Sequence, residues 1–253
     1  PAPPARPRPR RGRPGAPPRR AAPPCAAPEA RDPPPPAVVD AGQSVSIRSS
    51  PLNDRFLDPN LDVDKFVDTF EGESREISVN SDAIVESLEL RPGTRIADIG
   101  AGTGLFLEPL LRATGKRGSL VAVEISSGFL AHLEQRIREN GYKNARVQRG
   151  AFDSANLRSN SIDLAFVCDT YHHFDQPAEM LASIGSALVN GGRLVVVDFE
   201  RIPGVSRDWI LDHVRAGKEE FAAEITAAGF ELEREIDLPG LVENYVLVFR
   251  RVE

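Results

Sequence analysis

From residue 79 onward, short apolar runs alternate along the chain with segments in which apolar residues recur every three or four positions. The runs are typical of buried strands, and the spaced positions are typical of amphipathic helices. Apolar runs predict seven strands, over residues 94–99, 119–125, 145–150, 161–167, 193–199, 231–238 and 244–250. Helical spacing predicts helices over residues 82–90, 105–114, 129–137, 177–189, 206–213 and 218–228, the second of them kinked at Pro109.

The order of these elements predicts the fold class. Strands that alternate with helices of about 10–15 residues form a parallel sheet, and right-handed crossovers place the helices on both of its faces. The last two strands flank Pro239-Gly240 with no helix between them, which indicates an antiparallel hairpin. We therefore expect an α/β fold, a Rossmann-like doubly wound sheet of seven strands that is mostly parallel and has an antiparallel C-terminal hairpin. Ligands of such sheets bind outside the carboxyl ends of the strands.

Composition divides the chain into three parts. Residues 1–40 contain 15 of the 22 prolines, and eight arginines against three acids give this segment a net charge of +5. Such a composition cannot bury a core, so we expect residues 1–40 to form a disordered Pro/Arg-rich tail. Residues 41–78 are expected to form a transitional segment or lid, and residues 79–253 the main domain.

Charge and cysteine content restrict the partners and the compartment. Residues 41–253 hold 23 basic and 34 acidic residues, a net charge of −11, so we expect no nucleic-acid partner. No run approaches the roughly 18 apolar residues of a membrane span, so none is expected. Two cysteines, Cys25 and Cys168, make no disulfide framework and favour a reducing, cytoplasmic location. The sequence begins without Met, which leaves an exported or tethered form open; the oligomeric state is open too.

The sequence DIGAGTGL, which begins at Asp98, joins the first predicted strand to the helix that follows. A glycine-rich turn between a strand and a helix is a nucleotide-binding arrangement, because backbone without Cβ atoms can approach a ligand closely. The dinucleotide fingerprint G-x-G-x-x-G requires a glycine at the position of Leu105. The glycines instead stand at Gly100, Gly102 and Gly104. This spacing argues against NAD.

The turn resembles motif I of class I S-adenosylmethionine (SAM)-dependent methyltransferases. The resemblance extends over most of residues 79–250 and is nearest to small-molecule enzymes such as those of ubiquinone and menaquinone biosynthesis. It implies SAM as the cofactor and a small-molecule substrate, with Glu124 binding the ribose hydroxyls and Asp153 facing the adenine. The cofactor-binding residues that it implies are Asp98, Gly100, Ala101, Gly102, Gly104, Glu124, Ile125, Phe152, Asp153 and Asp169.

A second group of candidates lies in the sequence CDTYHHF, which begins at Cys168 and follows the fourth predicted strand. In the resembling family this segment lines the substrate side. A histidine can accept a proton during methyl transfer, since its pKa lies near neutrality. The predicted catalytic residues are therefore His172, Tyr171 and His173, and the predicted substrate-binding residues are Thr170, His213 and Arg215. One of the two adjacent histidines alternatively orients the loop.

A metal site is not expected. Asp169, His172 and His173 carry metal-ligating atoms, but no further Cys/His pair completes a tetrahedral set. In the segment before the main domain, Glu73 and Arg75 are candidate lid residues.

Two rival functions stay open, an NAD-dependent oxidoreductase and a non-catalytic SAM-binding module, because fold analogy alone does not exclude them.

Overall fold

The structure is a computed structural model that describes residues 51–72 and 75–252. The predicted tail over residues 1–40, Cys25 and Glu73 lie outside the described residues. Within the described residues no helix combines the length and the apolar character that crossing a bilayer requires.

Seven strands form one sheet in the order β3-β2-β1-β4-β5-β7-β6. β1 to β5 run parallel, while β7 pairs antiparallel with both β5 and β6. The predicted α/β fold, mostly parallel with an antiparallel C-terminal hairpin, is therefore confirmed. The strands are β1 (Arg95–Ile99), β2 (Ser119–Glu124), β3 (Ala145–Arg149), β4 (Ile162–Cys168), β5 (Leu188–Phe199), β6 (Phe230–Ile236) and β7 (Asn244–Arg251).

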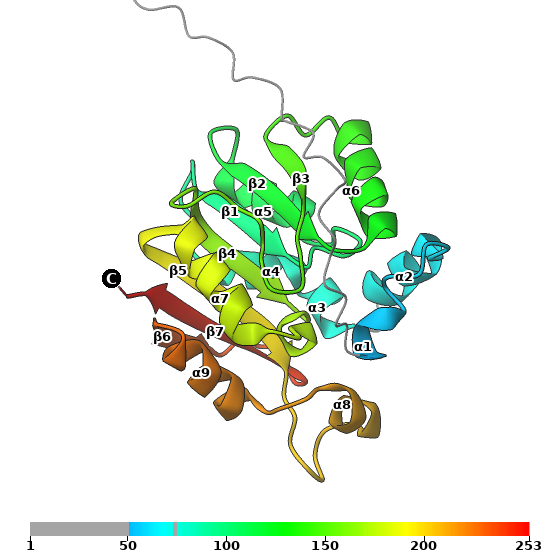
Figure 1. The fold of residues 1–253 in the computed structure, drawn as a ribbon, viewed down its shortest axis with the longest axis vertical. Coiled ribbons are helices and arrows are strands. Elements are labelled where there is room, and N and C mark those ends of the chain that lie inside the picture. Colours follow the sequence, from blue (N-terminus) through cyan, green and yellow to red (C-terminus); the bar gives the residue numbers. More distant parts are fainter. Residues whose placement is uncertain (1–50, 73–74, 253) are drawn as a thin grey trace, which may run out of the picture. The chain divides into compact units, whose positions relative to one another are not determined.

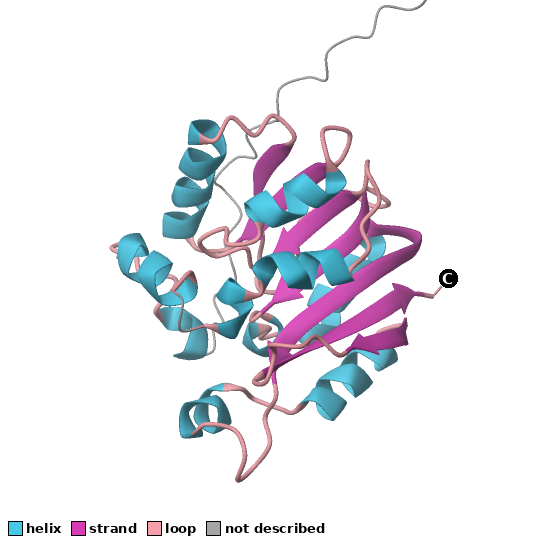
Figure 2. Ribbon diagram, turned by 180° about the vertical axis from the view of Figure 1, so that it is seen from behind, coloured by secondary structure: helices cyan, strands magenta, loops and turns pink. Residues whose placement is uncertain are grey.

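Helices pack on both faces of the sheet, as the opposite views of Figures 1 and 2 show. In β5, Leu194 and Val196 belong to one core and Val195 and Val197 to the other, because successive side chains of a strand point to opposite faces. Both faces of the central strands are buried, which is why they read as continuous apolar runs. One core contains α4 (Ser81–Ser87), α5 (Leu107–Thr114) and α6 (Ser127–Glu139), and the other contains α7 (Pro177–Ala187) and α9 (Lys218–Ala227).

The strand order reverses at β1, which pairs with β2 on one side and with β4 on the other. Such a reversal opens a crevice at the carboxyl ends of the two strands and is the usual ligand site of this architecture. Shorter elements gather at this end of the sheet (Figure 1): α1 (Pro51–Asp54), α2 (Val63–Phe70), α3 (Glu76–Val79), the 3-10 turn η1 (Tyr171–His173) and α8 (Asp208–His213).

Two local features differ from the prediction. β5 begins at Leu188 instead of residue 193, because Leu188 pairs with Ile162 before an irregularity in the register. Pro109 stands at the third position of α5, where its missing N–H has no helical acceptor to lose. It therefore fits the start of the helix and does not kink it.

Candidate active site

A cavity of about 1040 Å³ lies at the carboxyl ends of β1, β2 and β4. Its walls come from the loops after these strands, the loop after β3, the N-terminal segment and α8. Of the predicted site residues it is lined by Asp98, Gly100, Ala101, Gly102, Glu124, Ile125, Phe152, Asp169, Thr170, His172, His173 and His213. Four predicted residues are not among its lining residues: Gly104, Asp153, Tyr171 and Arg215.

The turn after β1 has a backbone that glycine adopts most readily. The φ angle is +74° at Gly100, +54° at Gly102 and +88° at Gly104. A Cβ at Gly100 would lie 2.3 Å from Cγ2 of Thr170, and one at Gly104 would lie 2.8 Å from leucine side chains of α5 and α6. Gly100 and Gly102 thus shape the cavity wall, whereas Gly104 allows the turn to pack against the helices.

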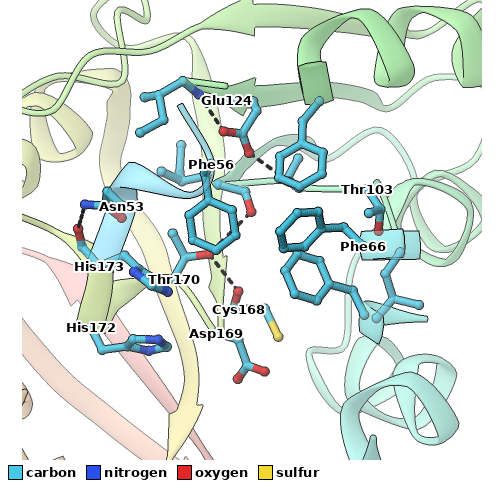
Figure 3. A pocket seen from close by; sticks show the side chains of 18 of the residues that line it. Asn53, Phe56, Phe66, Thr103, Glu124, Cys168, Asp169, Thr170, His172 and His173 are labelled. Atoms are coloured by element: carbon cyan, nitrogen blue, oxygen red, sulfur yellow. Dashed lines mark hydrogen bonds between the residues drawn. The ribbon is translucent and has the colours of Figure 1, made fainter. Parts of the chain in front are cut away.

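Glu124 ends β2 with its carboxylate in the cavity (Figure 3). The carboxylate accepts hydrogen bonds from the backbone N–H groups of Gly102 at 2.9 Å, Ile125 at 2.7 Å and Ser126 at 2.9 Å. Burial raises its pKa, and the three donors oppose that shift. Since a carboxylate offers about four lone-pair positions, the arrangement leaves room for a hydroxyl donor from a ligand.

Two more carboxyl groups face the same cavity, that of the buried Asp98 and that of Asp169, whose side chain is 10% exposed. Burial, and then the charge of Glu124, raises the pKa of Asp98 to about 7. Burial also raises the pKa of Asp169 to about 7, although Asp169 forms an ion pair with Arg75 and accepts a hydrogen bond from Nδ2 of Asn244 at 2.7 Å. Three carboxyl groups in one cavity favour a cationic ligand, because a nearby positive charge stabilises their ionised form.

The loop after β3 supports one of the two predicted adenine contacts. Phe152 is buried and lines the cavity. Asp153 is exposed and is not among the lining residues. The structure therefore does not place its carboxylate at the predicted adenine site, because the chain turns this side chain toward solvent.

Three histidines meet at the end of the cavity beyond β4. His172 and His173 belong to η1, and His213 ends α8. The ring centroids lie 4.2 Å apart for His172 and His173, 5.1 Å for His172 and His213, and 5.0 Å for His173 and His213. Burial, and then the neighbouring His172, lowers the pKa of His173 to about 2 and that of His213 to about 4. Both imidazoles are therefore neutral near pH 7.

Asp198, fully buried near the end of β5, orients His172. Its Oδ1 lies 2.7 Å from Nδ1 of His172, and its Oδ2 accepts the backbone N–H of His172 at 3.2 Å. Asp198 also accepts the backbone N–H of Phe199 at 2.8 Å. Because a carboxylate only accepts, Nδ1 of His172 is the donor in this contact, and Nε2 is the ring nitrogen that Asp198 leaves free of it.

Tyr171 and Arg215 are not among the residues that line the cavity, so the geometry does not support their predicted catalytic and substrate-binding roles. Tyr171 is fully buried, packs edge-on against Phe221 and donates its hydroxyl to Glu224 at 3.1 Å. Arg215 donates two hydrogen bonds of 2.7 Å to the same carboxylate. Both side chains therefore bind Glu224 of α9, and Tyr171 lies in the core beneath that helix.

The N-terminal helices cover the cavity with aromatic rings. Phe56, Phe66 and Phe70 form a cluster with Phe129 of α6, with centroid separations between 5.3 and 6.4 Å. Phe56 also meets the ring of His173 edge-on at 5.4 Å. These rings give the cavity an apolar surface on the side of the N-terminal segment.

Polar contacts tie the cover to the domain at three places. Nδ2 of Asn53 donates to the backbone carbonyl of His173 at 3.0 Å. Arg75 pairs with Asp169, and the carboxylate of Glu76 accepts three successive backbone N–H groups at the start of β7, at 2.8, 2.7 and 2.6 Å. The described part of the predicted lid is thus joined to both the cofactor-side and the histidine-side loops.

Sequence reasoning missed several residues of the site. Asp198 carried a signal, because it is the polar residue in RLVVVDF at the carboxyl end of a predicted strand, where ligands bind. Asn53 and Asn244 carried none, since their positions depend on contacts between segments far apart in the chain.

Comparisons with known proteins agree with this geometry. A family model described as a methyltransferase domain matches residues 97–194. The chain is 29% identical over 113 residues to an uncharacterized 37.1 kDa protein in transposon TN4556 of Streptomyces fradiae, a match that covers 45% of this chain and 32% of that protein. It is 25% identical over 111 residues to the ubiquinone/menaquinone biosynthesis C-methyltransferase UbiE of Wigglesworthia glossinidia brevipalpis, covering 44% of each. The chain thus spans less than half the length of these two relatives.

A solved structure extends the likeness to a larger share of the chain. The SAM-dependent methyltransferase from Aquifex aeolicus superposes with a TM-score of 0.67 at 18% identity, over 76% of this chain and 99% of its own. At this identity the likeness shows the fold, and the family match covers the glycine turn, Glu124 and both adjacent histidines. Residues 97–194 thus match a methyltransferase domain, and together the findings support a class I SAM-dependent methyltransferase with SAM as its cofactor.

Proposed function

We propose that the whole protein transfers the methyl group of SAM to a nucleophile on a small-molecule acceptor by direct displacement. One observation carries the proposal: the glycine turn and the histidines line the same cavity, of about 1040 Å³. Pockets for one drug-sized ligand measure about 300–1000 Å³. A volume at the upper end of that range suits SAM together with a small second ligand.

The cofactor would lie along the carboxyl ends of β1 and β2. Glu124 would accept a ribose hydroxyl, Phe152 would lie beside the adenine, and Asp98 would face the amino-acid end. SAM carries a sulfonium and an ammonium group, and its positive charge matches the three carboxyl groups of the cavity. Because ionisation of these carboxyls is held back by burial, binding of a cation would drive it.

The acceptor would occupy the end of the cavity between the aromatic cover and the histidines. Methyl transfer requires the nucleophile, the methyl carbon and the sulfur to be collinear, so positioning and exclusion of water are the main tasks of the protein. When the nucleophile keeps a proton, a group at this end has to help remove it. Nε2 of His172, held in orientation by Asp198, is placed for that role.

The cover also restricts the chemistry of the acceptor. Phe56, Phe66 and Phe70 offer apolar and aromatic surface, while the histidines offer polar contacts at one end. An apolar molecule that carries an O–H or N–H group, or an acidic C–H, fits both. The relative UbiE is described as a C-methyltransferase of ubiquinone and menaquinone biosynthesis, which agrees with an acceptor of this kind.

The test is methyl transfer from radiolabelled SAM to a panel of phenols, quinols and amines, beside calorimetric titration with SAM and with NADH. We expect SAM to bind, NADH not to bind, and label to appear in at least one acceptor class. Tight SAM binding with no transfer to any class would favour the non-catalytic module. Binding of NADH without SAM would favour the oxidoreductase.

A further inference from the structure

The three histidines at the acceptor end of the cavity lie close enough together to be considered as ligands of one ion. One ligand atom from each of His172, His173 and His213 lies within 4.8 Å of the other two. Tetrahedral Zn²⁺ holds its nitrogen ligands at about 2.0–2.1 Å, which separates them by about 3.3 Å. Small rotations of the rings would bring the three nitrogens onto one ion.

A second observation points to a ligand at this place. Nδ1 of His173 is buried and has no hydrogen-bond partner among the described residues. Buried polar atoms in native proteins are nearly always paired, since leaving one unpaired is unfavourable. A metal ion at the centre of the cluster would supply a partner for this ring, which packs against Phe56 and the other two histidines.

The surroundings of His172 match those of a metal ligand. Histidine ligands usually donate their second ring N–H to a carboxylate, which fixes the tautomer and strengthens the ligand nitrogen. Asp198 makes this contact at 2.7 Å and leaves Nε2 of His172 available.

We propose that His172, His173 and His213 bind one divalent first-row transition ion, and that its open position holds an oxygen or nitrogen donor of the methyl acceptor. Three imidazoles with one open position are a ligand set of catalytic zinc sites, so Zn²⁺ is the best match. All three histidines line the cavity, so the open position faces the space beside the glycine turn. Only the role given to the acceptor rests on the proposed function.

This inference reverses the expectation of a site without metal. That expectation considered the adjacent pair His172 and His173 together with Asp169. The fold brings His213 from α8 to the pair, and it turns Asp169 toward Arg75 and Asn244 instead.

The ion changes how the acceptor becomes a nucleophile. An O–H or N–H group bound to a divalent ion has a lowered pKa, so its proton is lost to solvent. A lone pair of that atom then forms the bond to the methyl carbon as the carbon–sulfur bond breaks, and the sulfur keeps the bonding pair in S-adenosylhomocysteine. With the ion bound, Nε2 of His172 is a ligand and does not act as the base.

The experiment uses the full chain, freed of any polyhistidine tag and stripped of metal with a chelator. Co²⁺ is titrated while its visible absorption is recorded, and Zn²⁺ is then added to displace it. We expect one equivalent of Co²⁺ with the intense absorption of a low-coordinate site, displacement by Zn²⁺, and a spectral change on adding azide to the open position. His213→Ala should weaken Co²⁺ binding at least about 100-fold, and Asp198→Asn about 10–100-fold.

The matched control is His132→Ala, which removes the fourth histidine of the chain, on α6. It should leave Co²⁺ affinity unchanged.

Titration of each variant with S-adenosylhomocysteine shows that its domain is folded and tests the proposed function separately. S-adenosylhomocysteine binding without Co²⁺ binding would overturn the metal site alone. An equal loss of Co²⁺ affinity in His132→Ala and His213→Ala would also overturn it. Co²⁺ binding without S-adenosylhomocysteine binding would support the metal site and contradict the proposed function.

Discussion

The two ends of the cavity are built in different ways. The cofactor end is formed largely by backbone. It consists of a glycine turn with positive φ angles and of the Glu124 carboxylate, which accepts two N–H groups just after it in the chain and one from the glycine turn. The acceptor end is formed by side chains that belong to η1, β5, α8 and the N-terminal segment.

Because of this difference, we expect related proteins to share the cofactor end and to differ at the acceptor end. A turn whose shape depends on missing Cβ atoms tolerates few substitutions, so its spacing remains readable in sequence. A cluster of side chains can be rebuilt by changing a few residues on separate loops. The cofactor end therefore identifies the reaction class, and the acceptor end sets the substrate.

The largest expected effect comes from filling the turn at Gly100. Gly100→Ala should lower the free energy of unfolding by about 2–5 kcal/mol, because its Cβ meets Thr170 and its φ is +74°. Gly141→Ala is the matched control: φ is +66°, but nothing lies within 4 Å of the added Cβ, so the loss should be about 1–2 kcal/mol. Equal losses in urea denaturation would show that the contact with Thr170 is not what requires glycine.

The next effect concerns the cofactor end alone. Glu124→Ala should weaken SAM binding by about 1–3 kcal/mol, since a charge-assisted hydrogen bond to the ribose is lost. Asp153→Ala, which removes an exposed carboxylate near the same loops, should leave the dissociation constant unchanged. Calorimetry measures both. If Asp153→Ala weakened SAM binding as much as Glu124→Ala, the predicted contact between Asp153 and the adenine would be supported after all.

A smaller effect is the pH dependence of SAM affinity. The pKa of Asp98 is raised to about 7 in the free protein, so the group is mostly protonated at pH 6 and mostly ionised at pH 7.5. A cation binds the ionised form better, so affinity should rise with pH, by about eightfold between these values for one such group. Asp98→Asn should remove the contribution of this group and leave that of Asp169, whose pKa is also raised to about 7. Affinity that falls over this interval would contradict a cationic ligand beside Asp98.

The smallest effect tests the correction at Tyr171. Tyr171→Phe removes the hydrogen bond to Glu224 and should lower the free energy of unfolding by about 1 kcal/mol. SAM affinity and the rate of methyl transfer should both stay within twofold of the wild type. A large loss of transfer with intact stability would return Tyr171 to the catalytic residues.

Sequence could predict the fold and much of the cofactor end, because both depend on local patterns. The apolar runs located all seven strands, and the spacing of Gly100 and Gly102 with a carboxylate at Glu124 predicted which loops meet. In the loop after β3, Phe152 is buried and lines the cavity, whereas the next residue, Asp153, is exposed and does not, a difference that the sequence pattern does not predict.

The acceptor end was less predictable for a physical reason. Tyr171, His172 and His173 are consecutive, yet the 3-10 turn sends the first into the core and the other two to the cavity. The meeting of His213 with the pair, and of Asp198 with His172, depends on packing between distant segments, which no spacing rule encodes.

The most direct test of the central claim is a crystal structure with S-adenosylhomocysteine bound. We expect a ribose hydroxyl within hydrogen-bond distance of the Glu124 carboxylate, and the amino-acid part beside Gly100 and Gly102. The sulfur should point toward His172. An empty cavity, or a ligand bound with its ribose away from Glu124, would contradict the account.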